Sequence, residues 1–479
     1  MIFKNQNLKD VVVLTTGKMI QVLLGFATLR LITELLSEED VGVYYTLLTV
    51  VSLLAFVFFN PLGQFYGRNL VHWQQSRNVR NATVMMLLLR MMAMPFALLV
   101  AVLCFYTFDY NKYFSIFSYS IFMVVAILAL THGILLNATN VLINRVTFIA
   151  FTVGTLVLGF IASLLLVQIN ETAMNWLYGL FGTQIFISYF LYKKITAGQP
   201  LSVPMMKKSV NREYVTRVLF FILPVSLTLF LQWGQTTSFR LIVEDLYSAR
   251  ALASIAVGMA VSSAIFSALE TLFQQFYMPV YLRKITSKPA EKRADAWNEL
   301  ARALLPVYVA VTIYVIAMSP ALTQLLVADK FHDSYVYAMI GACIELLRVT
   351  TNLTYMVSQS EIKTKTTVMP YLIGFIVMVT GLLSVDVSGS LWIVPSILVV
   401  SYMMVQALMY LNMRRLLPIS IDVRLCLRSA LMASPLLFAM GFVPDSSLAV
   451  SILVLALGGI YLLSGLYFLQ IDHLKKMAS

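Results

Sequence analysis

The sequence predicts an all-α integral membrane protein with about fourteen transmembrane helices. Of its 479 residues, 60% are hydrophobic and only 12% are charged, against about 45–50% and about 25% in an average soluble domain. Apolar stretches of about 17–25 residues recur along the whole chain, and each is long enough to cross a hydrocarbon layer of about 30 Å. The stretches are continuous, whereas the strands of a membrane barrel alternate between apolar and polar residues.

The predicted spans follow one another with short polar connections. No connection is long enough to fold as a separate soluble domain. In chain order, the expected spans are 11–34, 41–66, 82–107, 113–138, 146–169, 173–192, 217–243, 251–279, 302–327, 334–357, 366–385, 390–412, 429–444 and 447–469.

Basic residues alternate between the connections in a way that predicts the topology. Lys and Arg are retained in short cytoplasmic loops, and one set of alternate connections holds nearly all of them, whereas acidic residues collect in the other set. We therefore expect both termini on the cytoplasmic side of an inner, cytoplasmic-type membrane. The formal net charge of +12 is then a topology signal that also attracts anionic membrane lipids, and it gives no support for nucleic-acid binding.

A short internal repeat predicts two similar halves. Residues 30–34 (RLITE) match residues 240–244 (RLIVE), and Gln64-Phe65-Tyr66 matches Gln275-Phe276-Tyr277 at nearly the same offset. Six spans separate the copies, so both run in the same direction, as in several transporter folds. The expected organisation is a first six-helix lobe over 1–195, a basic cytoplasmic connector over 196–216, a second six-helix lobe over 217–413, and two further helices with the C-terminus over 414–479.

Ionisable residues inside the predicted spans are the candidate functional residues. Each costs at least a few kcal/mol in hydrocarbon unless it faces a wet cavity or a partner. The basic candidates for binding an anionic head group are Arg30, Lys18, Arg90, Arg240 and Arg348, and the acidic candidates for carrying a coupling proton are Glu270 and Glu345. An excess of basic groups in a membrane cavity favours an anionic ligand, and the planar guanidinium suits phosphate oxygens.

A structural explanation of these charges stays open beside the functional one. Arg30 with Glu34, and Arg240 with Glu244, have the i,i+4 spacing of a helical ion pair, and Glu345 with Arg348 has the i,i+3 spacing. Lys18 and Arg90 lie about 12–15 Å from the inner ends of their helices, so snorkelling explains part of their depth. His132 fits a hydrogen-bonded helix contact better than a proton carrier.

The first two predicted helices resemble a known family. Gly17, Leu29-Arg30-Leu31 and the segment 35–44 (LLSEEDVGVY) are similar to the opening of polysaccharide-type flippases. Those flippases belong to the multidrug/oligosaccharidyl-lipid/polysaccharide (MOP) exporter superfamily, which also holds the MATE drug exporters and the lipid II flippases. The resemblance covers about sixty residues. Ser37 stands where many relatives have proline, and many polysaccharide-type members are described with twelve helices.

The resemblance implies an O-antigen-type (Wzx-like) flippase with the two-lobed MOP fold. Such a protein moves an undecaprenyl-pyrophosphate-linked oligosaccharide from the cytoplasmic to the periplasmic leaflet by alternating access, alongside polysaccharide polymerase machinery. Only Arg30 matches the family's basic position in the first helix, and the other basic candidates come from the residues alone. We expect no enzymatic activity, no cofactor and no metal, because no phosphate-binding or zinc-binding motif occurs.

Three alternatives remain. A cation-coupled multidrug exporter of the same fold usually carries a carboxylate within its first helix, and this helix carries Lys18 there. A membrane polysaccharide polymerase or ligase needs a large outward loop, and no such loop is predicted. A purely structural membrane scaffold does not account for the repeated, charged helices.

Overall fold

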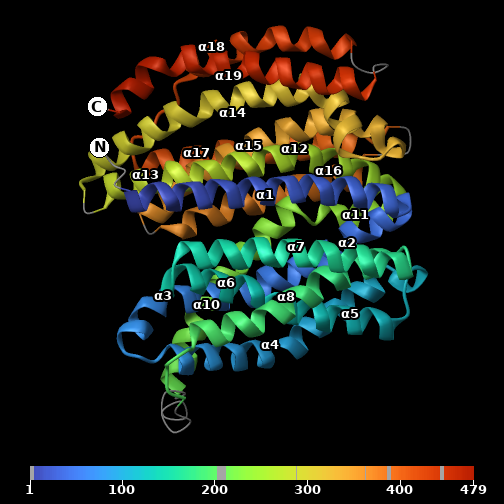
Figure 1. The fold of residues 1–479 in the computed structure, drawn as a ribbon, viewed down its shortest axis with the longest axis vertical. Helices are drawn as coiled ribbons and strands as arrows, with labels where there is room; N and C mark the ends of the chain where they lie inside the picture. The colour runs from blue at the N-terminus through green and yellow to red at the C-terminus, as the bar shows by residue number, and fades with distance from the viewer. Residues whose placement is uncertain are drawn as a thin grey trace. The chain divides into compact units, whose positions relative to one another are not determined.

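The computed structural model describes residues 5–201, 212–286, 288–361, 363–385, 390–442 and 447–478. All regular structure within these ranges is helical, as predicted (Figure 1). Residue contacts divide the chain into two compact units. Unit 1 comprises residues up to Thr28 and Leu35–Ala249, and unit 2 comprises Leu29–Glu34 and Arg250–Ser479.

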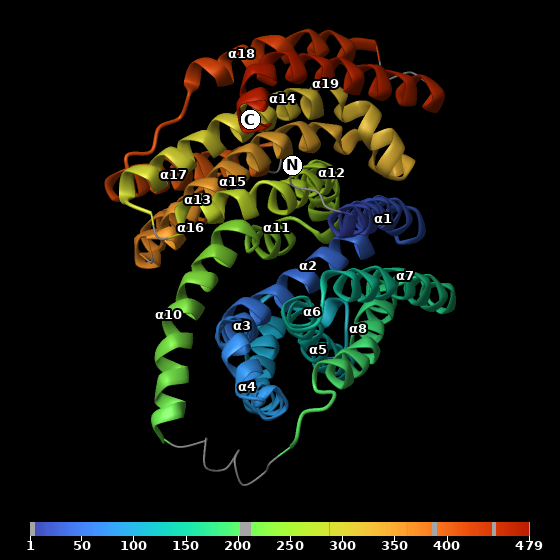
Figure 2. The same ribbon diagram turned by 60° about the vertical axis from the view of Figure 1, so that its left-hand side comes forward.

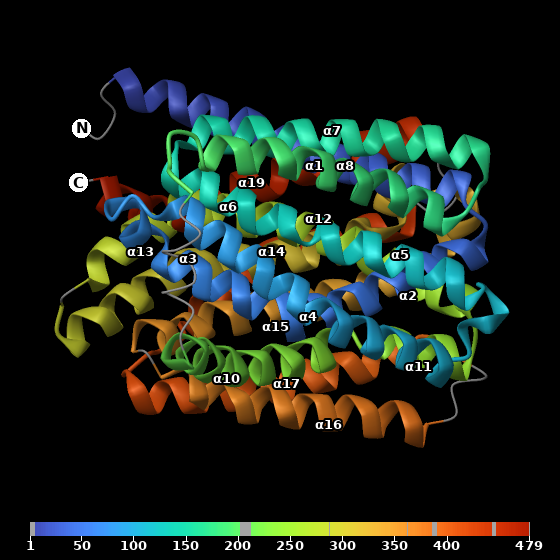
Figure 3. The same cartoon turned by 90° about the horizontal axis from the view of Figure 1, so that it is seen from below.

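Unit 1 contains most of the first helix and the eleven described helical segments that follow it, up to α11. Apart from α10, its long helices run roughly parallel or antiparallel to one another (Figure 3). The elements are α1 (Asn5–Leu35), α2 (Glu38–Leu54), η1 (Ala55–Phe59), α3 (Asn60–Gln75), α4 (Val79–Thr107), η2 (Tyr110–Lys112), α5 (Ile116–Ala129), α6 (Thr131–Leu142), α7 (Arg145–Ile169), α8 (Ala173–Ile195), α10 (Arg212–Thr236) and α11 (Phe239–Leu246).

Unit 2 is built around the long helix α14, which α15, α18 and α19 flank. The elements are α12 (Ala249–Phe276), α13 (Met278–Ile285), α14 (Ala290–Leu326), η3 (Asp329–Ser334), α15 (Tyr335–Ser360), η4 (Thr364–Thr367), α16 (Val368–Ser384), α17 (Ile393–Leu416), α18 (Val423–Ala433), η5 (Ser434–Phe442) and α19 (Leu448–Ala478).

The chain is a multi-pass membrane protein. Among the described residues, 12 helices are long and apolar enough to cross a bilayer, and they coincide with twelve of the fourteen predicted spans. The other two predicted spans, 11–34 and 173–192, lie in α1 and α8, which are 31 and 23 residues long but carry more polar residues. Residues 202–211 of the predicted connector 196–216 lie outside the described residues, and the predicted division into lobes stays a prediction.

Four spans that we predicted as single helices are broken. The predicted helix 217–243 consists of α10 and α11, 113–138 consists of α5 and α6, 251–279 lies in α12 and α13, and 429–444 lies in α18 and η5 as far as it is described. A hydropathy window averages over such breaks, because a kinked helix exposes the same apolar residues as a straight one.

Pro61 bends the second helix. The segment α2–η1–α3 is continuous, with a π-helical turn over Ala55–Phe59 immediately before Asn60 and Pro61. Proline has no N–H, so the carbonyl of Val57, four residues earlier, loses its usual helical donor. The hydroxyl of Ser226 in α10 donates to this carbonyl at 2.8 Å. A polar side chain from another helix therefore stabilises the bend, as a membrane interior requires.

The ends of the two repeated helices, α1 and α10–α11, belong to different units. Helix α10 belongs to unit 1 (Figure 2), where the indole N–H of Trp233 donates to the carbonyl of Thr49 at 3.1 Å. The last turns of α1, Leu29–Glu34, belong to unit 2. There the backbone N–H of Ala328 donates to the hydroxyl of Thr33 at 3.0 Å.

Close packing of α7 against α8 depends on a glycine, which gives a stability test. A Cβ at Gly179 would overlap the backbone of Ala162 and Ser163, whereas a Cβ at Gly182 meets no atom within 4 Å. We expect Gly179→Ala to destabilise the protein by about 1–3 kcal/mol through overpacking and to lower the thermal unfolding midpoint in detergent. The matched control, Gly182→Ala, should not lower it, and equal midpoints for the two variants would contradict this packing.

Candidate functional site

A charged cluster occupies the interior of unit 2. Arg348 in α15 binds Glu270 of α12 and Glu345 of its own helix, each at 2.7 Å. The side-chain amide of Asn352 donates to Glu270 at 2.9 Å. The side chains are 24% exposed for Arg348, 18% for Glu270 and 10% for Glu345. We call these four residues the acid–arginine cluster. Two carboxylates share one guanidinium, so a proton on either carboxyl would neutralise the cluster.

The acid–arginine cluster borders a cavity of about 420 Å³ in unit 2. Glu270 and Asn352 lie in its wall beside Gln274, Tyr308 and Gln359. Of the predicted site residues, the structure therefore brings together Glu270, Glu345 and Arg348, and it confirms the predicted i,i+3 ion pair. The contact with Glu270 connects two helices that are far apart in the sequence, and spacing alone did not reveal it.

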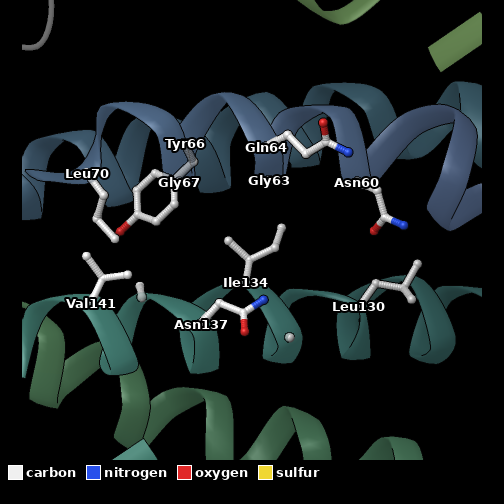
Figure 4. Close-up of a pocket in the computed structure, with 12 residues that line it drawn as sticks. Asn60, Gly63, Gln64, Tyr66, Gly67, Leu70, Leu130, Ile134, Asn137 and Val141 are labelled. Atoms are coloured by element: carbon white, nitrogen blue, oxygen red, sulfur yellow. The ribbon is translucent and has the colours of Figure 1, made fainter. Parts of the chain in front are cut away.

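Unit 1 holds a second cavity, of about 470 Å³, between α3 and α6. Asn60 and Gln64 of α3 and Asn137 of α6 lie in its wall. Figure 4 shows the amides of Asn60 and Asn137 turned into the space between the two helices. Within the described part of the chain, none of the three side chains makes a hydrogen bond to another protein group. We call this space the amide cavity.

The predicted internal repeat offers a comparison of the two cavities. Four of the lining residues in α6, Ile134, Asn137, Ala138 and Val141, have the same spacing as four of the lining residues in α15, Val349, Asn352, Leu353 and Met356. The offset that aligns Gln64 with Gln275 also aligns Phe59 with Glu270. The correspondence of the two cavities stays a prediction, and their walls differ in charge.

Arg90 of α4 contacts the position that corresponds to Glu270. Its guanidinium carbon lies 4.6 Å from the ring centroid of Phe59, in cation–π contact, and the residue is 4% exposed. Among the described residues, Nη1 and Nη2 have no hydrogen-bond partner. Arg348 of unit 2 is bound by two carboxylates, whereas Arg90 packs against the face of the Phe59 ring.

Arg30 is used to hold a helix end. It forms the predicted ion pair with Glu34 at 3.1 Å, and it donates to the carbonyl of Val327 and, at 3.5 Å, to that of Gln324. These carbonyls end α14, where the helix dipole favours a cation. The contacts favour the structural explanation for Arg30 that the sequence left open.

The remaining basic candidates have other surroundings. The guanidinium of Arg240 lies 5.1 Å from the ring centroid of Tyr45, and Lys18 donates to the side-chain oxygen of Gln21 at 3.0 Å. Glu244 is bound at 2.8 Å by Lys112 and at 2.9 Å by the hydroxyl of Tyr113. Burial and this hydrogen bond raise the pKa of Tyr113, so it stays a proton donor.

Sequence reasoning missed the amide cavity. Uncharged amides are ordinary in membrane helices, so their presence alone does not indicate a binding site. The pattern that could have indicated the cavity is the pairing of Asn60 with Gln64 and of Gly63 with Gly67, each at i,i+4, directly around the helix-bending Pro61. Such pairs place polar groups and bare backbone on neighbouring helix faces.

Comparison with known proteins identifies the fold. No family model and no curated protein sequence matches the chain. Among solved structures, it resembles the lipid II flippase MurJ in an inward closed conformation, with a TM-score of 0.66 and 11% identity over 97% of this chain and 99% of that one. It also resembles an inward-facing MATE-family multidrug resistance transporter of the MOP superfamily, with a TM-score of 0.61 and 11% identity over 84% and 94%.

A MATE structure in the straight conformation has a TM-score of 0.57 and 13% identity, with 85% of this chain and 96% of that chain covered. At these identities the likeness shows the fold. The predicted fold class, an all-helical membrane protein with a MATE-like fold, is confirmed, and these neighbours are transporters and a flippase rather than enzymes.

The acid–arginine cluster gives a second stability test. Arg348→Ala leaves two part-buried carboxylates without their cation, and we expect a loss of about 3–5 kcal/mol. Adding Glu270→Gln and Glu345→Gln removes the uncompensated charge and should recover most of this loss. The measurement is the thermal unfolding midpoint at neutral pH. A triple variant no more stable than Arg348→Ala would show that the ion pairs do not hold this region together.

Proposed function

We propose that this protein is a flippase for an undecaprenyl-pyrophosphate-linked oligosaccharide, such as the repeat unit of O-antigen or another surface polysaccharide. The substrate moves from the cytoplasmic to the periplasmic leaflet of a bacterial inner membrane, and both termini are cytoplasmic. The support is the fold shared with a lipid II flippase over nearly the whole chain, together with basic groups inside apolar helices. The reaction makes and breaks no covalent bond.

Arg90 is the observation that carries the proposal. A buried guanidinium with two unpartnered nitrogens is costly unless an anion neutralises it. Pyrophosphate is such an anion, and guanidinium binds it through paired hydrogen bonds. A cationic drug would be repelled by this group. We therefore propose Arg90 as the first contact of the head group, with Lys18 and Arg240 as further basic groups along its path.

Transport proceeds by alternating access, in which the two lobes rock against each other while the lipid tail stays in the bilayer. The acid–arginine cluster carries the coupling proton in this proposal. Protonation of Glu270 or Glu345 removes the excess negative charge of the cluster, and deprotonation restores it. The two states differ by one charge inside a membrane helix bundle, which is enough to bias a conformational equilibrium by several kcal/mol.

A cation-coupled multidrug exporter is the second candidate. The likeness to MATE transporters and the acids of the cluster favour it. This candidate requires an essential acid and tolerates the loss of Arg90, so the two candidates make opposite predictions.

The first functional prediction concerns Arg90. In proteoliposomes at matched protein levels, wild type should transfer a fluorescent undecaprenyl-pyrophosphate oligosaccharide between leaflets, and Arg90→Gln should slow transfer on the order of tenfold to a hundredfold, because charge-assisted hydrogen bonds are lost. Arg90→Lys keeps the charge without the paired hydrogen bonds and should fall between the two.

The matched control is Arg145→Gln, which removes an exposed guanidinium at the start of α7 and should leave transfer unchanged. No lipid transfer by wild type, together with pH- or sodium-driven efflux of a cationic dye that survives Arg90→Gln, would assign the chain to the multidrug branch.

The second functional prediction concerns coupling. A pH gradient, acidic on the periplasmic side, should accelerate transfer by wild type, and Glu270→Gln or Glu345→Gln should abolish the acceleration, because an amide does not take up the proton. Glu299→Gln is the control, since Glu299 binds Lys284 outside the cluster. A gradient response that persists in both cluster variants would exclude the cluster as the proton site.

A further inference from the structure

We propose that the amide cavity of unit 1 is the subsite for the sugar of the transported lipid, separate from the basic groups that receive its head group. This inference deepens the proposed function and rests on it. The cavity lies between α3 and α6, and its volume of about 470 Å³ is within the usual range for ligand pockets, about 300–1,000 Å³.

The chemistry of the wall selects a neutral ligand rich in hydroxyl groups. None of the 12 lining residues is charged. The amides of Asn60, Gln64 and Asn137 each offer two donors and an acceptor, and no described protein group satisfies them. A sugar hydroxyl donates and accepts at once, so it matches an amide better than a phosphate or a hydrocarbon tail does.

The polar wall disfavours lipid tails as the occupant of the cavity. Asn60, Gln64 and Asn137 lie in helices long and apolar enough to span the bilayer. Amides turned toward a hydrocarbon tail would each cost about 2–7 kcal/mol, whereas polar residues within such helices typically face an aqueous cavity or a ligand. The cavity of unit 2 differs in charge, because Glu270 lies in its wall.

Glycines widen the space. A Cβ at Gly67 or Gly133 would meet no other group within 4 Å, and both residues line the cavity. Because glycine has no side chain, a sugar ring can approach the helix backbone closely at these positions. The cavity also begins at Asn60, the residue after Phe59, and Phe59 contacts Arg90. The proposed sites for head group and sugar are therefore neighbours, as the pyrophosphate and the first sugar are in the lipid.

Occupancy can be measured independently of transport. Val141, 52% exposed in the cavity wall, is replaced by cysteine after Cys104, Cys343 and Cys426 are changed to alanine. The labelling rate by a soluble maleimide is measured in nanodiscs with undecaprenyl pyrophosphate, either sugar-free or bearing an N-acetylhexosamine, a hexose or a 6-deoxyhexose. At least one sugar-bearing lipid should slow labelling where the sugar-free lipid does not. Adding Asn137→Ala should weaken this protection on the order of tenfold.

A variant whose larger side chain fills the cavity gives the second readout, the dependence of transport on the sugar. Gly133→Leu should lower the ratio of sugar-bearing to sugar-free lipid transfer on the order of tenfold, whereas Gly154→Leu, equally free of close contacts but in α7, should not change the ratio. Equal labelling with all four lipids would overturn the sugar subsite and leave the flippase proposal intact. Sugar-dependent protection without any lipid transfer would retain the subsite and overturn the flippase.

Discussion

The lack of water inside a bilayer is the constraint on which this structure depends. Every polar group at that depth needs a partner from the chain, from a cavity or from a ligand. The carbonyl that Pro61 frees is bound by Ser226. The carbonyl of Ile316, which Pro320 deprives of its donor, is bound by the hydroxyl of Ser319 at 2.9 Å. Helices can therefore bend in this protein without leaving backbone groups unpaired.

Against this background, the unpaired groups are informative. Arg90 and Asn60 are two such groups, and both lie close to the π-helical turn of the second helix: Arg90 contacts Phe59, the last residue of the turn, and Asn60 follows directly after it. A π-turn rotates the residues that follow it relative to those before it, and such turns are frequent at functional sites. Asn60 lies in the wall of the amide cavity together with Gln64 and Asn137, and Phe59 contacts Arg90.

The sequence was sufficient for the membrane class and for the helix count to within the two polar spans, because hydropathy and charge are local properties. It was not sufficient for the helix breaks at Leu130 and Thr237, where no proline marks the position. Among the site residues, the pair of Glu345 and Arg348 followed from helical spacing. The approach of Glu270 is a tertiary contact across 78 positions, and no periodicity encodes it.

The division of α1 between the two units has a consequence for biosynthesis. Arg30 and Val327 are 297 positions apart, so the last turns of the first helix are translated long before their partners at the end of α14. Unit 2 is therefore completed by a segment, Leu29–Glu34, that is made before nearly all of unit 1. A chain break between residues 35 and 249 would remove the covalent link between this segment and the rest of unit 2.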